Sequence, residues 1–177
     1  MPVDMENIVE RRLRLHIEPK RSLLDELDMD AYLRFDLSGI VVDHDRYMNT
    51  RYQNRLRFSF AHEVGHFVLH KGVYNGLDLS TPEEWKELVL HESDEEYRSF
   101  EWQANEFAGR LLVPRKQLMH EIEKIHEVIK KRDLEQYLKD DPWAVLTRVS
   151  PVLCKPFGVS EIVIETRVER EELWPPN

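Results

Sequence analysis

The sequence predicts an α+β fold that is mostly helical, with a small antiparallel sheet of about three strands near the N-terminus. Residues 31–42 are rich in β-forming side chains, whereas almost everything after residue 55 repeats its apolar side chains at helical spacing. Apolar residues make up 41% of the 177 residues, which is enough for a real core. This length suits one compact domain, or one domain with a small appendage.

The expected elements follow in chain order. A short helix is expected over residues 19–28 after an irregular start. Ser38-Gly39 then predicts a turn between two strands within residues 31–42, and a third strand is expected near Tyr47–Asn49. The capping box Thr81-Pro82-x-Glu84 predicts the start of another helix. Further helices are expected over residues 55–70, 95–112, 115–131, 143–154 and 160–173. We expect a main domain of residues 1–135 and a helical appendage of residues 136–177 packed on it.

Composition and charge narrow the functional classes. No apolar run approaches the ~18 residues that a membrane span needs, and the N-terminus lacks the apolar stretch of a secretory signal. Cys154 is the only cysteine, so an intramolecular disulfide is excluded. The net charge of −9 disfavours non-specific nucleic-acid binding, and the four arginines of residues 46–58 are interpreted as a solvated segment. We therefore expect a cytoplasmic protein without membrane or direct nucleic-acid contacts.

The first chemical motif is His62-Glu63-Val64-Gly65-His66, an H-E-x-x-H pattern. Two histidines four residues apart share one face of a helix, so both imidazoles can reach one metal ion. The glutamate lies close to that face and can hold and deprotonate a metal-bound water molecule. The motif by itself is only suggestive, because such short patterns also arise by chance.

The surrounding helix favours a functional interpretation of this motif. At 100° per residue, the apolar side chains share one arc and the motif's polar side chains lie on the opposite arc. The predicted core arc consists of Phe60, Val64, Phe67 and Val68. A surface helix with two exposed histidines is disfavoured, since residues 58–70 contain no Lys or Arg. His70, one turn further on, could line the cleft or act as an extra ligand, but packing at the helix end is favoured.

A catalytic zinc ion keeps three protein ligands, and the helix of residues 95–112 is the best source of the third. Its predicted buried arc is Phe100, Ala104, Phe107, Ala108 and Leu111. Glu101 and Asn105 lie together on one flank of this arc, whereas Glu106 is expected to point toward solvent. A carboxylate at the edge of a core needs a charge partner, so Glu101 is the predicted ligand, with Glu106 as the alternative. Asn105 is predicted to accept a hydrogen bond from the non-coordinating nitrogen of His62.

These residues resemble the ImmA/IrrE family of metalloendopeptidases. The resemblance rests on Arg57-Phe58-Ser59-Phe60-Ala61 leading into the H-E-x-x-H motif, and on the E-x-x-A-N-x-F-A and L-L-V-P patterns within residues 101–114. It covers about residues 25–130, and Gly39 and Tyr47–Asn49 also sit where the family places a short hairpin. The 34 residues between His66 and Glu101 are more than usual, so the acidic segment 76–96 is expected to be a lid or a partner surface.

The resemblance implies a zincin-like domain with a gluzincin-like site. It implies zinc on His62, His66 and Glu101, with Glu63 as the general base of peptide hydrolysis. Members of the family are typically bacterial or phage proteins that cleave or act upon a helix-turn-helix repressor. Such a repressor silences a mobile element, a stress response or a toxin–antitoxin locus. The expected partner is therefore a repressor or an antitoxin.

Several alternatives stay open. The protein could bind zinc and a repressor as a sensor without turnover, although binding zinc does not require Glu63. DNA binding by the tail is disfavoured, because residues 161–172 carry five acids and two arginines. An enzyme acting on something other than protein is disfavoured by the second motif. The group that stabilises the oxyanion is open among four candidates, which are His70, Tyr97, Arg51 and Tyr52.

Overall fold

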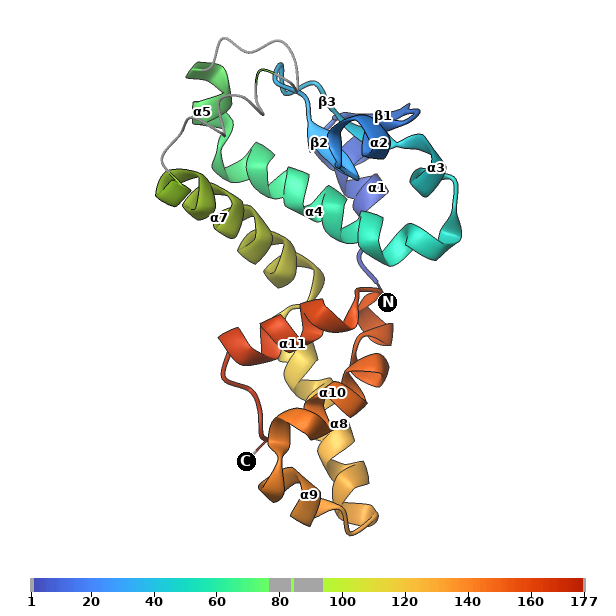
Figure 1. Ribbon diagram of the computed structural model, residues 1–177, viewed down its shortest axis with the longest axis vertical. Coiled ribbons are helices and arrows are strands. Elements are labelled where there is room, and N and C mark those ends of the chain that lie inside the picture. Colours follow the sequence, from blue (N-terminus) through green and yellow to red (C-terminus); the bar gives the residue numbers. More distant parts are fainter. Residues whose placement is uncertain (1, 77–83, 85–93, 177) are drawn as a thin grey trace. The chain divides into compact units, whose positions relative to one another are not determined.

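The computed structural model describes residues 2–76, 84 and 94–176 (Figure 1). The chain divides into two compact units, one of residues Asp4–Ala108 and one of Gly109–Asn177 with the first three residues. We call them the N-terminal and the C-terminal unit. The predicted class is confirmed, because the described chain is mostly helical with one three-stranded sheet. The expected division at residue 135 stays a prediction.

The sheet lies in the N-terminal unit and is mixed, so the expected antiparallel sheet is wrong. Its strands are β1 (His16–Lys20), β2 (Ala31–Leu33) and β3 (Gly39–Asp43), in the order β1-β3-β2. The predicted hairpin of β2 and β3 is confirmed, with Leu33 opposite Ile40. However, β1 pairs with β3 in parallel. A Cβ at Gly39 would lie 2.5 Å from the carbonyl oxygen of His16, so this close pairing needs a glycine.

The third strand was predicted in the wrong place. Residues near Tyr47 form a helix, α3 (His44–Tyr47), instead of a strand. Its start is explained by Asp43, whose carboxylate accepts hydrogen bonds from the backbone N–H groups of Arg46 and Leu24. This N-cap turns the chain into a helix directly after β3. The expected irregular start is also wrong, since α1 (Met5–Asn7) and the π-helix η1 (Ile8–Arg12) precede β1.

Helices cover the sheet and build the core of the N-terminal unit. The short helix α2 (Leu23–Leu27) lies within the predicted range 19–28 and packs Leu23 and Leu27 against Val41 of β3. The 3-10 turn η2 (Thr50–Tyr52) leads into the long helix α4 (Gln53–Leu69), which packs against β2. A short helix, α5 (Lys71–Gly76), follows α4. This arrangement places the H-E-x-x-H motif beside the strand β2.

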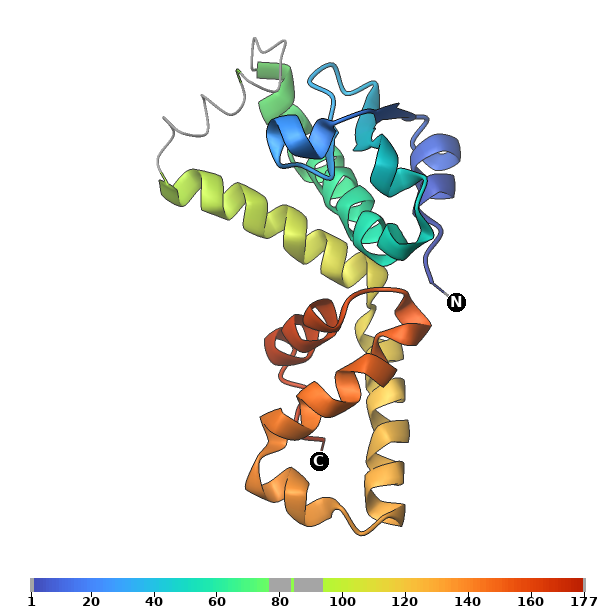
Figure 2. The same cartoon turned by 45° about the vertical axis from the view of Figure 1, so that its right-hand side comes forward.

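The helix α7 (Asp94–Leu112) runs antiparallel to α4, as both views show (Figures 1 and 2). Both helices were predicted within two residues of their observed ends, but two side chains were misplaced. Val68 was expected in the core and is 51% exposed, because the side of the last turn of α4 that is buried is the one that carries His66 and His70. Glu106 was expected in solvent and is 9% exposed. A second side of α7 is therefore buried, which a count of one apolar arc does not predict.

Because α4 and α7 are in close contact at Gly65, we expect Gly65→Ala to destabilise the protein although alanine favours helices. A Cβ at Gly65 would lie 3.1 Å from the carbonyl oxygen of Ala104 and 3.2 Å from Cδ1 of Phe107. We expect the overpacked variant to lose about 1–3 kcal/mol of unfolding free energy in urea titrations. Gly72→Ala is the matched control, because nothing lies within 4 Å of its added Cβ. Equal stability of the two variants would contradict this close packing.

The C-terminal unit consists of helices. They are α8 (Arg115–Lys131), α9 (Glu135–Asp140), α10 (Pro142–Leu153), the 3-10 turn η3 (Lys155–Phe157) and α11 (Glu161–Arg170). The prediction of α8 is confirmed at both ends, and those of α10 and α11 within three residues, whereas α9 was missed. The apolar side chains of α8, α10 and α11 form the core of this unit. No described helix is long and apolar enough to span a membrane.

The helix predicted to begin at Thr81 and most of the acidic segment 76–96 lie outside the described residues. The exceptions within this segment are Gly76, Glu84 and the start of α7.

Candidate metal centre

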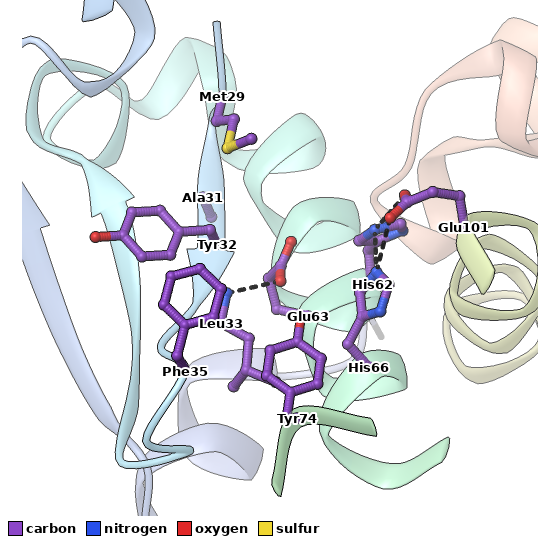
Figure 3. A pocket seen from close by; sticks show the side chains of 10 residues that line it. All are labelled: Met29, Ala31, Tyr32, Leu33, Phe35, His62, Glu63, His66, Tyr74 and Glu101. Atoms are coloured by element: carbon purple, nitrogen blue, oxygen red, sulfur yellow. Dashed lines mark hydrogen bonds and ion pairs between the residues drawn. The ribbon is translucent and has the colours of Figure 1, made fainter. Parts of the chain in front are cut away.

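Two helices bring the predicted ligands to one point. The Nε2 atoms of His62 and His66 on α4 are 2.9 Å apart. The carboxylate of Glu101 on α7 lies 3.2 Å from Nε2 of His62 and 3.4 Å from Nε2 of His66 (Figure 3). Because α4 and α7 are antiparallel, Asn105 lies one turn further along α7, opposite His62. The structure thus places Glu101 between the two imidazoles and the predicted partner of His62 beside it.

The spacing of these atoms fits a zinc ion. A tetrahedral zinc with ligands at 2.0–2.2 Å separates its ligand atoms by about 3.3–3.6 Å. The two imidazole nitrogens are 2.9 Å apart, which is below that range, and they lie 3.2 and 3.4 Å from the two different oxygens of Glu101. One ligand atom from each of the three residues lies within 4.8 Å of the others. Two imidazole nitrogens and one carboxylate are also the ligand types of a catalytic zinc site. These residues therefore fit a zinc ion if their ligand atoms move apart by a few tenths of an ångström.

Hydrogen bonding around His62 shows why a cation belongs at this point. The side-chain oxygen of Asn105 lies 3.0 Å from Nδ1 of His62 and accepts its hydrogen. A neutral imidazole protonated at Nδ1 presents a lone pair at Nε2, which faces the Glu101 carboxylate. Two electron-rich groups at 3.2 Å repel each other unless a proton or a metal ion lies between them.

The pKa values of Glu101 and His62 also indicate that this cluster favours a bound positive charge. Burial opposes ionisation of Glu101, but its hydrogen bonds to His62 and His66 and their charges outweigh that effect and lower its pKa to about 2. Burial likewise opposes protonation of His62, yet the hydrogen bond to Glu101 and the nearby carboxylates raise the pKa of His62 above its ordinary value. Both shifts mean that the metal-free cluster stabilises positive charge beside the Glu101 carboxylate, where zinc would bind.

Glu63 lines the cavity next to the cluster. Its side chain is buried, and Oε2 accepts a hydrogen bond of 2.8 Å from the backbone N–H of Leu33 in β2 (Figure 3). Burial raises the pKa of Glu63, an effect that the neighbouring imidazoles of His62 and His66 partly offset. A carboxyl group with a raised pKa beside a metal site is suited to accept and return a proton near neutral pH.

The cavity has a volume of about 230 Å³. The candidate metal site and Glu63 form one side of it, and the segment around β2 forms the other. The lining residues outside the motifs are Met29, Ala31, Tyr32, Leu33, Phe35 and Tyr74. None of these six was predicted, because they come from short segments without a recognisable pattern. The apolar character of residues 31–42, already assigned to strands, hinted at only four of them, and nothing pointed to Met29 or Tyr74.

The remaining candidates are placed differently. His70 is buried and packs on Phe100, with its Nδ1 3.0 Å from Nδ1 of His66, on the side of that ring away from Glu101. Its position agrees with packing at the helix end and not with a role as an extra ligand. Arg51 and Tyr52 belong to η2, before the start of α4. They lie about 15 Å along the helix axis from His62 and do not line the cavity. The side chain of Tyr97 lies outside the described residues.

The fold and the site define a class, a mostly helical α+β protein with an H-E-x-x-H helix facing a glutamate on a second helix. The family model of the IrrE N-terminal-like domain, a peptidase family designated M78, matches residues 49–169. The chain belongs to this family, which confirms the predicted resemblance and supports a metallopeptidase-type function in general terms. Comparisons with curated proteins and with solved structures give no match.

Proposed function

We propose that the protein is a zinc-dependent metalloendopeptidase that hydrolyses a peptide bond in a protein partner. The observation that carries this proposal is the convergence of His62, His66 and Glu101 within 3.4 Å of one another, with the carboxyl group of Glu63 in the same cavity. Metal binding alone would not need Glu63. A buried carboxyl group with a raised pKa at this position favours hydrolysis over a binding function.

In the proposed reaction, His62, His66 and Glu101 would hold the zinc ion. When bound, the ion would polarise the scissile carbonyl group and lower the pKa of a water molecule. Glu63 accepts a proton from the attacking water as its oxygen bonds to the carbonyl carbon. Glu63 then delivers this proton to the amide nitrogen as the carbon–nitrogen bond breaks, which gives a carboxylic acid and an amine. The second proton of the water passes from the new carboxyl group to the amine, so the final products are a carboxylate and an ammonium group.

The cavity also suits an extended peptide. Its wall includes β2, which is an edge strand of the sheet because the strand order is β1-β3-β2. An edge strand can accept a further extended chain through main-chain hydrogen bonds. A peptide aligned along β2 would pass directly beside Glu63, since the backbone of Leu33 already bonds to that side chain.

Tyr74 is our candidate for stabilising the oxyanion. It comes from α5, is 6% exposed and lines the cavity, and its hydroxyl end points toward Glu63 (Figure 3). A phenol hydroxyl can donate a hydrogen bond to the oxygen that gains charge as water adds to the carbonyl. Tyr74 was not among the predicted candidates, because only the turn into α5 directs it back into the cavity.

Tyr74→Phe is expected to lower kcat by about 10²-fold, the cost of losing one oxyanion donor, while KM and zinc affinity change little. Steady-state kinetics with the cleaved partner and a chelator competition measure these quantities. Tyr52→Phe is the matched control, because Tyr52 lies outside the cavity. A kcat close to that of the wild type would remove Tyr74 from the mechanism.

Zinc affinity is expected to depend on pH in a defined direction. Because the pKa of His62 is raised in the metal-free protein, zinc must displace a proton from it below that pKa. The apparent affinity should be flat at high pH and fall about tenfold per unit once the pH drops below this raised value. Chelator competition between about pH 5 and 9 measures the onset. An onset below about 6.5, the ordinary value, would contradict the raised pKa.

For the substrate, we propose a helix-turn-helix repressor or antitoxin, as the resemblance to the ImmA/IrrE family implies. The test is incubation of the zinc-loaded full chain with the repressor encoded beside its gene. We expect cleavage by the wild type and none by Glu63→Gln. If both proteins leave the repressor equally intact while binding it, the chain is a zinc-binding sensor and the protease proposal fails.

A further inference from the structure

The two histidines of the candidate metal site are supported in different ways on their outer sides. Nδ1 of His62 bonds directly to the amide of Asn105. Nδ1 of His66 instead lies 3.0 Å from Nδ1 of His70, one helical turn later, and both side chains are almost fully buried. An imidazole can donate or accept at either nitrogen, so His70 alone does not determine where His66 carries its hydrogen.

Gln103 on α7 determines the orientation of this pair. Its side-chain oxygen lies 3.3 Å from Nε2 of His70, and its side-chain NH₂ group donates to the hydroxyl oxygen of Ser99 at 3.2 Å. With the NH₂ group directed at Ser99, the oxygen of Gln103 is left to accept from His70. Nε2 of His70 therefore carries a hydrogen.

The position of one hydrogen then fixes the next. A neutral His70 protonated at Nε2 has an acceptor at Nδ1. His66 must therefore donate from its own Nδ1, which leaves the lone pair of its Nε2 free and directed at the cluster. This is the only neutral form of His66 that can bind a metal ion through Nε2.

The ring of His70 is held in place by the same helix that carries Glu101. His70 stacks on Phe100, with ring centroids 3.8 Å apart and planes 23° apart. Phe100 and Gln103 flank Glu101 on α7, so the stacking and the hydrogen bond locate α7 against α4 next to the third ligand.

We propose that His70 and Gln103 are positioning residues, which form a relay that holds His66 in its metal-binding tautomer. This inference rests on the zinc site of the proposed function but not on hydrolysis. The relay does for His66 what Asn105 does directly for His62. It also gives His70 a function that its placement away from the metal position would not suggest.

The experiment compares variants of Gln103, whose side chain is exposed and tolerates substitution without loss of the core. Gln103→Leu removes the acceptor, whereas Gln103→Glu keeps an oxygen that can only accept. Zinc affinity of the full chain is measured by chelator competition at about 0.5 M salt, which screens the added charge. Gln136→Leu is the matched control, since Gln136 is also an exposed glutamine that bonds within its own helix.

We expect Gln103→Leu to weaken zinc binding about tenfold, within the range for lost support of a metal ligand. Gln103→Glu should stay within about threefold of the wild type, and Gln136→Leu should equal it. His70→Phe, which keeps the stacking on Phe100 but has no ring nitrogen, should lose up to about 100-fold. Thermal unfolding of the metal-free variants checks that the fold is retained.

Two results would overturn the relay. One is wild-type zinc affinity in Gln103→Leu, and the other is an equal loss in Gln103→Leu and Gln103→Glu, which would mean that an acceptor oxygen at this position does not support zinc binding. These results are distinct from failure of the proposed function. If the zinc affinities of the wild type and the variants follow the expected pattern but the wild type cleaves no partner, the relay is supported and the proposed peptidase activity is refuted.

Discussion

Glu63→Gln is expected to reduce peptide hydrolysis by about 10²–10⁴-fold while the protein keeps its zinc ion and its fold. The amide oxygen of glutamine can still accept the hydrogen bond from the backbone N–H of Leu33, so the side chain keeps its place. An amide cannot take up the proton of the attacking water, and this loss alone removes the activity. Single-turnover cleavage of the partner protein at equal zinc occupancy measures the effect.

The matched control for this variant is Glu26→Gln, the same substitution at a surface position of the N-terminal unit. It removes an exposed ion pair with Lys20, which contributes little to stability, and should leave cleavage unchanged. Cleavage by zinc-loaded Glu63→Gln at the rate of the control would refute the role of Glu63. Loss of zinc from Glu63→Gln would instead assign this residue to metal binding.

The second large effect is expected from Glu101→Ala. This change removes one of the three proposed ligands and leaves His62 and His66 without the carboxylate that lies 3.2 and 3.4 Å from them. Zinc affinity should fall by more than about 100-fold, which is the upper limit for losing a group that only supports a ligand. Chelator competition and native mass spectrometry of the full chain measure the change.

Glu106→Gln is the informative control, because Glu106 lies on the same helix and was the alternative to Glu101 when only the sequence was considered. We expect zinc affinity within about threefold of the wild type for this variant, since its side chain is not part of the cluster. Strong zinc binding by Glu101→Ala together with weak binding by Glu106→Gln would show that Glu106, and not Glu101, is the third ligand.

The placement of the cluster could be predicted because it depends on local periodicity. His62 and His66 are four residues apart, and so are Glu101 and Asn105, and both pairs share a face of a helix in the structure. Only the pairing of the two helices is non-local. The motif order of the ImmA/IrrE family and the apolar arcs of both helices were enough to place Glu101 and Asn105 opposite the histidines.

The parts that were missed depend on contacts between distant segments. Strand β1 has one partly buried apolar residue, Ile17, and a proline, so nothing in its sequence indicates that it pairs in parallel with β3. Val68 and Glu106 were misplaced because a helical count describes one apolar arc and not what covers the rest of a helix. The contact of His70 with Gln103 likewise requires both helices at their final separation.

X-ray absorption at the zinc edge of the loaded full chain tests the central claim most directly. The account predicts two imidazole ligands and oxygen ligands from Glu101 and solvent, all at about 2.0–2.2 Å, with one position open for exchange. His70 should not contribute, because its nitrogens face His66 and Gln103. A spectrum with a third imidazole, or with sulfur at about 2.3 Å from Cys154, would contradict the proposed centre.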